Sequence, residues 1–148
     1  MIEIPNNEEV KEIIRQSLSL EFPLYHPSHS VFVKRSQEKS RRLCINYDSR
    51  KSDYANRSWR THLDLTVSND IFYLVSIAIN EEFRGQGNGW GLYQAAFSTA
   101  REMGFQFVRQ TPSGGPIING VRTCSRKDYL LKRGCIPAPG NQVDWIIV

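Results

Sequence analysis

The sequence has little of what stabilises small secreted proteins or places a protein in a membrane. Its three cysteines, Cys44, Cys124 and Cys135, are an odd number at distant positions, which argues against a disulfide framework. No apolar run approaches the roughly 20 residues that a membrane-spanning helix needs, and residues 1–6 lack the basic start of a secretory signal. We therefore expect a cytoplasmic protein.

Clusters of metal ligands are also scarce. His26 and His29 are the one close pair of histidines, and their spacing relative to Cys44 matches no common zinc pattern. We therefore expect no metal site.

What the chain does have is the composition of an ordinary globular protein. Hydrophobic residues make up 40% of its 148 residues and charged residues 23%, which is typical of soluble domains. The length suits one hydrophobic core. We therefore expect a single domain over residues 1–148 that exists as a monomer or a homodimer.

The positive charge is concentrated in two blocks. Residues 34–60 carry nine Lys or Arg against three acids, a net charge of +6, and residues 109–133 carry six against one, a net charge of +5. Such blocks are either solvated faces that aid solubility or contacts for an anionic partner. The sequence alone leaves both interpretations open.

The order of apolar patterns predicts a protein of the α/β (α+β) class. Asn6 followed by Glu9 is typical of a helix start, and apolar residues then recur at helical spacing over 8–20. The predicted strands are 30–33, 42–47, 63–67, 71–79, 105–109 and 143–148. The further predicted helices are 90–103 and a short one from Ser125 to Gly134. The predicted loops are 48–60, which we expect to be mobile, and 111–120. This order predicts a central mixed β-sheet flanked by helices, with strand 71–79 buried on both faces.

A glycine-rich loop follows strand 71–79 and precedes a helix. It reads Arg84-Gly85-Gln86-Gly87-Asn88-Gly89. In such a turn, several backbone N–H groups and the positive end of the helix dipole can face phosphate oxygens. Glycine lets the phosphates approach the backbone closely, and Arg84 adds a positive charge at the rim. The alternative is a tight turn that binds no ligand.

The loop matches neither of two common nucleotide-binding motifs. A P-loop requires Gly-Lys followed by Ser or Thr, and the loop lacks this sequence. A Rossmann fingerprint requires Gly-x-Gly-x-x-Gly, and none of the three glycines begins that pattern. Instead, the stretch Ile79-x4-Arg84-Gly85-Gln86-Gly87-Asn88-Gly89-x2-Leu92 resembles the acetyl-CoA motif of the GCN5-related N-acetyltransferase (GNAT) superfamily, written Arg/Gln-x-x-Gly-x-Gly/Ala. The similarity continues in Ala100-Arg101-Glu102-Met103-Gly104-Phe105 and, more weakly, in Lys132-Arg133-Gly134-Cys135.

This resemblance covers about residues 71–135 and implies a GNAT-like fold. It also implies acetyl-CoA as co-substrate and transfer of the acetyl group to a primary amine by direct attack on the thioester, without a metal. The pantetheine arm would lie along the strand, with its amides paired to the strand backbone, and the phosphates would lie on the loop. The implied cofactor-binding residues are Val75, Ile77, Ile79, Arg84, Gly85, Gln86, Gly87, Asn88, Gly89 and Trp90.

The catalytic residues of the family have no obvious counterparts in this chain. The usual acidic position on the strand falls on Tyr73. Among the nearest carboxylates, Asp70, Glu81 and Glu82, we take Glu81 as the candidate base, although each also suits a solvated turn. His62 can accept a proton near neutral pH, but a single histidine in a polar segment is usually a surface residue.

The tyrosine with which many family members protonate the departing thiolate is also displaced. Its position falls on Leu130. Tyr129 is adjacent, and a shift of one residue turns a helical side chain by about 100°. Tyr129 is therefore a candidate acid if the alignment shifts by one residue, and otherwise a core aromatic.

Two other classes of function remain open. One is a module that keeps the fold, binds CoA, protein or nucleic acid, and lacks catalysis. The other is a nucleic-acid-binding protein in which Tyr47, Tyr54 and Trp59, within the first basic block, stack on bases. If the protein is an enzyme, the same block favours an amine acceptor carried on an anionic macromolecule or an acidic protein surface.

Overall fold

The computed structural model describes residues 2–36, 42–49, 61–80, 83–110, 117–118, 121–122, 126–139 and 145–147. Over these ranges the elements are α1 (Asn7–Glu21), β1 (Ser30–Arg35), β2 (Leu43–Asp48), β3 (His62–Ser68), β4 (Ile71–Ala78), α2 (Asn88–Glu102), β5 (Phe107–Gln110), β6 (Ile117–Ile118), β7 (Val121–Arg122), α3 (Arg126–Lys132), β8 (Ile136–Pro137) and β9 (Trp145–Ile147).

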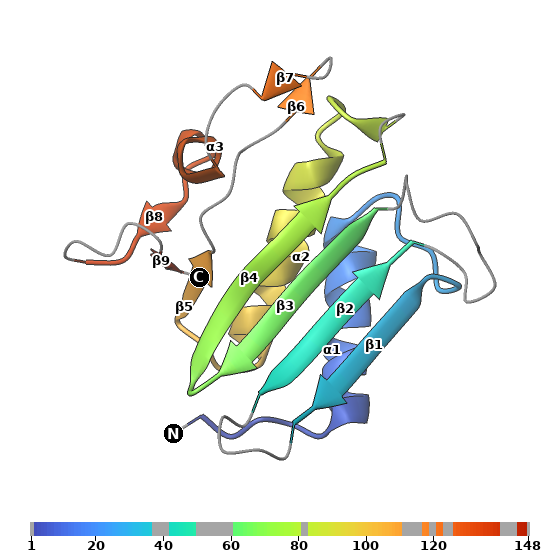
Figure 1. Ribbon diagram of the computed structural model, residues 1–148, viewed down its shortest axis with the longest axis vertical. Coiled ribbons are helices and arrows are strands. Elements are labelled where there is room, and N and C mark those ends of the chain that lie inside the picture. The colour runs from blue at the N-terminus through green and yellow to red at the C-terminus, as the bar shows by residue number, and fades with distance from the viewer. Residues whose placement is uncertain are drawn as a thin grey trace.

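The main sheet has seven strands in the order β1-β2-β3-β4-β5-β9-β8, while β6 and β7 form a separate pair. Strands β1 to β4 are antiparallel neighbours, β4 and β5 are parallel, and β9 is antiparallel to both β5 and β8. Helix α2 makes the crossover that a parallel pair of strands requires. The predicted mixed sheet flanked by helices is therefore confirmed (Figure 1).

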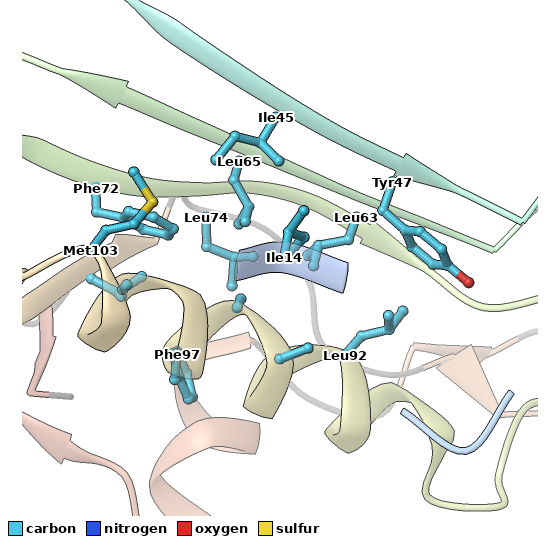
Figure 2. Close-up of a cluster of buried hydrophobic side chains, with 14 of the residues drawn as sticks. Ile14, Ile45, Tyr47, Leu63, Leu65, Phe72, Leu74, Leu92, Phe97 and Met103 are labelled. Atoms are coloured by element: carbon cyan, nitrogen blue, oxygen red, sulfur yellow. The ribbon is translucent and has the colours of Figure 1, made fainter. Parts of the chain in front are cut away.

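The hydrophobic core lies between the sheet and two helices. Helices α1 and α2 both lie on the same side of strands β1 to β4 (Figure 1). Figure 2 shows the side chains that fill this layer, including Ile14 from α1, Leu65 and Leu74 from the sheet, and Leu92 from α2, all of which are fully buried. This packing fixes the end of β4 relative to the start of α2, between which the glycine-rich loop lies.

The first helix begins where the sequence predicts. The Asn6 side-chain oxygen accepts a hydrogen bond from the Glu9 backbone N–H at 2.9 Å, and the Asn6 amide donates to the Glu9 carboxylate at 2.9 Å. This reciprocal arrangement satisfies two groups at the helix start. Helix α1 ends at Glu21, directly before Phe22 and Pro23.

Strand β4 differs from its prediction in one important respect. Phe72 and Leu74 are fully buried, but the Val75 side chain is 38% exposed, so the strand is not buried on both faces. The reason is that both long helices cover one face, and no helix in the described part of the chain covers the other face of β1 to β4 (Figure 1).

Several boundaries also differ from the predictions. Helix α2 begins at Asn88, two residues before the predicted start. Strands β6, β7 and β8 were not predicted, and β6 lies within the predicted loop 111–120. Each has only two residues, which is too short for an alternating pattern to be recognised. Most of the predicted loop 48–60 lies outside the described residues.

Candidate active site

The glycine-rich loop joins the end of β4 to the start of α2. Gly85 and Gly87 have φ angles of 76° and 80°, which residues with a side chain rarely adopt. Gly87 is the N-cap of α2 and provides no side-chain hydrogen bond to it. The backbone N–H groups of the first turn are therefore not capped by this residue, and such groups normally need an external partner.

Gly89, in contrast, is a glycine that the fold itself does not require. It lies in the first turn of α2, and a Cβ atom built on it would meet nothing closer than Ile79 Cγ1, at 3.9 Å. Glycine destabilises a helix by about 1 kcal/mol relative to alanine. Neither backbone conformation nor packing within the described chain explains its presence, whereas a ligand that approaches the helix start does.

Side chains hold the loop in shape. Arg84 Nε donates to the Ile79 carbonyl at 3.0 Å, and the Asn88 amide donates to the Phe83 carbonyl at 3.0 Å. The Asn88 side chain is buried and thus serves the loop itself. Arg84, by contrast, is exposed, so its guanidinium remains accessible to an anion.

The start of the loop is tied to the start of β3. The Asn80 N–H donates to Thr61 Oγ1 at 3.1 Å, and the Thr61 hydroxyl donates to the Asn80 side-chain oxygen at 3.2 Å. Thr61 is buried, so this contact is shielded from water. It fixes the point at which the chain leaves β4.

The described pairing of strands β4 and β5 has two rungs. Tyr73 is opposite Arg109 and Leu74 is opposite Gln110, the last described residue of β5. The second half of β4, residues 75–78, follows the last of these described rungs and precedes the glycine-rich loop. This segment contains the predicted pantetheine-binding residues Val75 and Ile77.

A β-bulge lies at the same point of β4. Asp64 is opposite Ser76, but the next residue of β3, Leu65, is opposite Leu74, so β4 contains one extra residue, Val75. Simple alternation would place Ser76 on the buried face with Leu74. The extra residue reverses the alternation, and Ser76 lies instead on the outer face of the sheet, the face that α1 and α2 do not cover.

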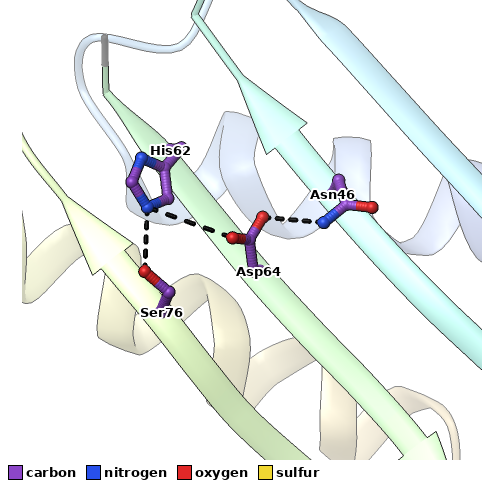
Figure 3. A network of polar contacts seen from close by, with 4 residues as sticks. All are labelled: Asn46, His62, Asp64 and Ser76. Atoms are coloured by element: carbon purple, nitrogen blue, oxygen red, sulfur yellow. Dashed lines mark hydrogen bonds and ion pairs between the residues drawn. The ribbon is translucent and has the colours of Figure 1, made fainter. Parts of the chain in front are cut away.

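A polar network occupies this outer face (Figure 3). His62 Nε2 lies 2.9 Å from the Ser76 hydroxyl oxygen and 4.0 Å from Asp64 Oδ2. The Asn46 amide donates to Asp64 Oδ1 at 2.7 Å. Three neighbouring strands therefore bring together an amide, a carboxylate, a histidine and a hydroxyl beside the bulge. Sequence analysis considered His62 only as an isolated residue, because nothing in the local sequence indicates its cross-strand neighbour Ser76.

The candidate acid Tyr129 lies elsewhere, against α2. Its ring centroid is 5.4 Å from that of Tyr93 and 6.3 Å from that of Trp90, and the Arg133 guanidinium carbon lies 4.8 Å from the Tyr129 centroid. Leu130, at the family's tyrosine position, is completely buried. Tyr129 rather than Leu130 thus faces the first turns of α2. The candidate base Glu81 lies outside the described residues.

The profile of the acetyltransferase (GNAT) family matches residues 11–113. This match extends from α1 to just beyond β5 and includes the whole loop between β4 and α2. The chain belongs to the GNAT family. Comparison with curated proteins and with solved structures returns no match.

Membership of the GNAT family makes acyl transfer the activity class of the chain, and the family generally uses acetyl-CoA. Among the described residues, no group of three or more His, Cys, Asp or Glu side chains could hold a metal ion. In the same part of the chain, no helix is long and apolar enough to span a membrane.

Proposed function

We propose that this GNAT protein transfers the acetyl group of acetyl-CoA to a primary amine by direct attack on the thioester. The observation that carries the proposal is the presence of glycine at two positions at the start of α2. Gly87 gives no side-chain cap, and Gly89 leaves open space where a side chain would project. A helix start with glycine at these two positions suits the CoA phosphates, which would accept hydrogen bonds from its backbone N–H groups.

The second half of β4 suits the pantetheine arm. Residues 76–78 of β4 follow the last described rung of the pairing with β5, and an extended ligand with amide groups can pair with strand backbone as an added strand would. The distance from Val75 to Ile79 is about 13 Å at the usual rise per residue. Val75, Ile77 and Ile79 would line this arm, and the thioester would lie near the middle of β4.

The reaction needs alignment and proton transfer rather than a metal. The acceptor nitrogen forms a bond to the thioester carbonyl carbon, the carbon–sulfur bond breaks, and CoA departs as the thiol. Backbone N–H groups near the thioester would stabilise the oxyanion, and the fixed geometry would align the two reactants. Tyr129 is our proposed proton donor to the departing sulfur, because its neighbour Leu130 is completely buried.

Gly89→Val tests the cofactor site. The valine side chain would occupy the space at the start of α2, so acetyl-CoA binding measured by calorimetry should be lost while the protein remains folded. Glu102→Val, which places the same side chain at an exposed position in the last turn of α2, should bind acetyl-CoA like the parent. Undiminished affinity in Gly89→Val would contradict the proposed site.

We further propose that the acceptor amine is carried on an anionic macromolecule or an acidic protein surface. The support is the net charge of +6 in residues 34–60, which a free cationic amine would not favour. Neutralising Arg50, Lys51, Arg57 and Arg60 together should weaken acceptor binding and flatten its salt dependence, with acetyl-CoA affinity unchanged. Unaltered acetylation of the macromolecular acceptor at low and moderate salt would instead indicate that the acceptor is a small amine.

A further inference from the structure

The polar network on the outer face of the sheet lies next to the proposed position of the thioester. His62 contacts Ser76 across strands β3 and β4, and Ser76 directly follows the bulge residue Val75. Only 21% of the His62 side chain is exposed. The histidine is thus largely buried, and its partner Ser76 belongs to the segment of β4 proposed to bind pantetheine.

The geometry differs from that of a Ser-His-Asp triad. In a triad, the carboxylate binds Nδ1 of the histidine, while Nε2 faces the serine. Here Ser76 and Asp64 both face Nε2, while Nδ1 is buried with no hydrogen-bond partner among the described residues. Asp64 therefore cannot orient the ring through Nδ1. This argues against an acyl-serine intermediate. The role that remains for the pair is proton transfer between the Ser76 hydroxyl and His62 Nε2.

Carboxylates lie close to the His62 ring. Asp64 Oδ2 lies 4.0 Å from Nε2, and Asn46 holds that carboxylate in place. On β2, Asp48 is directly opposite His62, while on β4 the neighbours Ser76 and Ala78 carry no charge. The described charged residues beside His62, Asp64 on its own strand and Asp48 on β2, are thus both acidic.

We propose that Ser76 and His62 together accept the proton of the acceptor amine, with Asp64 and Asn46 as positioning residues. This inference depends on the proposed transfer reaction. The acceptor ammonium gives one proton through the Ser76 hydroxyl to His62 Nε2, and the neutral nitrogen then bonds to the thioester carbon. Tyr129 gives its proton to the departing sulfur, and a second proton from the nitrogen restores the Tyr129 hydroxyl. The products are the amide, CoA thiol and one proton, which His62 releases to solvent.

The test compares two amine probes in an assay of CoA-thiol release. A lysine-containing peptide is an ammonium ion at pH 7 and must lose a proton before attack, whereas hydroxylamine is already largely neutral. In His62→Gln, kcat/KM for the peptide should fall by about 10²- to 10⁴-fold, the usual contribution of general-base catalysis, with the loss mainly in kcat. The loss for hydroxylamine should be at least tenfold smaller, and the KM for acetyl-CoA should remain unchanged.

Three further variants separate proton transfer from folding. His26→Gln removes a different histidine, which is exposed and lies outside the network, and should leave both rates unchanged. Ser76→Ala should reproduce the selective loss with the peptide. Added imidazole should restore part of the peptide activity of His62→Ala, because it can replace the missing base, and it should not stimulate the parent.

The outcomes distinguish this inference from the proposed function. An equal loss for both probes in His62→Gln, together with no rescue by imidazole, would show that His62 has only a structural role, while acetyl transfer by the parent would still stand. A parent protein that releases no CoA thiol with either probe would overturn the proposed transfer and this inference together.

Discussion

The two faces of strands β3 and β4 have different tasks. On the face covered by the helices, Leu63, Leu65, Phe72 and Leu74 are at most 1% exposed. On the opposite face, the same strands carry the polar residues His62, Asp64 and Ser76, which contact one another. Successive residues of a strand point to opposite faces, so a change of one position moves a substitution from the core to the candidate site.

This difference teaches that stability and chemistry can be tested separately within one strand. A substitution on the buried face removes packing and should lower the free energy of unfolding. A substitution on the outer face removes polar contacts that are partly open to water, which contribute only about 0.5–1.5 kcal/mol each to stability. Its main effect should therefore be on the reaction.

The sharpest contrast is expected between the adjacent residues Leu74 and Val75. Leu74→Ala should lower the free energy of unfolding by about 2–5 kcal/mol, because it leaves a cavity in the core. Val75→Ala removes a side chain that is 38% exposed and should cost distinctly less. Chemical denaturation of both variants measures the difference. Similar losses in the two variants would mean that the outer face is covered in solution.

A second contrast compares two glycines of the same backbone conformation. Gly87 and Gly134 have φ angles of 80° and 85°, and a Cβ atom on either would meet no atom within 4 Å. Alanine at either position should therefore destabilise the fold by a similar amount, about 1–2 kcal/mol. Only Gly87→Ala should also weaken acetyl-CoA binding, as measured by calorimetry. Equal affinities in both variants would place the phosphates away from the loop.

The smallest effect is expected at Tyr47, a residue with a polar group on the buried face of the sheet. Its ring is buried and its hydroxyl lies 2.7 Å from His29 Nδ1. Burial, with smaller contributions from Tyr25 and Asp48, raises the pKa of Tyr47 well above its ordinary value of 10.0. The unfolded chain therefore ionises first as the pH rises, and the stability contributed by the protonated tyrosine is present below pH 10 and declines above it.

Tyr47→Phe should remove this part of the alkaline decline. The variant should lose about 1 kcal/mol at neutral pH, for one hydrogen bond, and should then lose less than the parent between neutral pH and pH 11. Unfolding free energies at several pH values measure both slopes. Parallel slopes for the two proteins would show that Tyr47 does not contribute to the alkaline loss.

Local signals in the sequence were sufficient for much of the fold and part of the candidate site. The cap formed by Asn6 and Glu9 depends on residues three positions apart, and Gly85 and Gly87 of the loop are required by backbone angles at single positions. The order of the main elements follows from apolar periodicity. The short strands β6, β7 and β8 were missed because two residues carry no periodic signal.

By itself, the sequence determined where most helices and strands form and which loop is rich enough in glycine to be a candidate phosphate site, because these features depend on neighbouring residues. Only the tertiary structure decided which residues meet on the outer face. Asn46, Asp64 and Ser76 come from three strands, and their alignment depends on the register of the sheet. Ser76 points outward only because the bulge at Val75 reverses the alternation of β4, and such a bulge arises from pairing with β3 rather than from any local pattern.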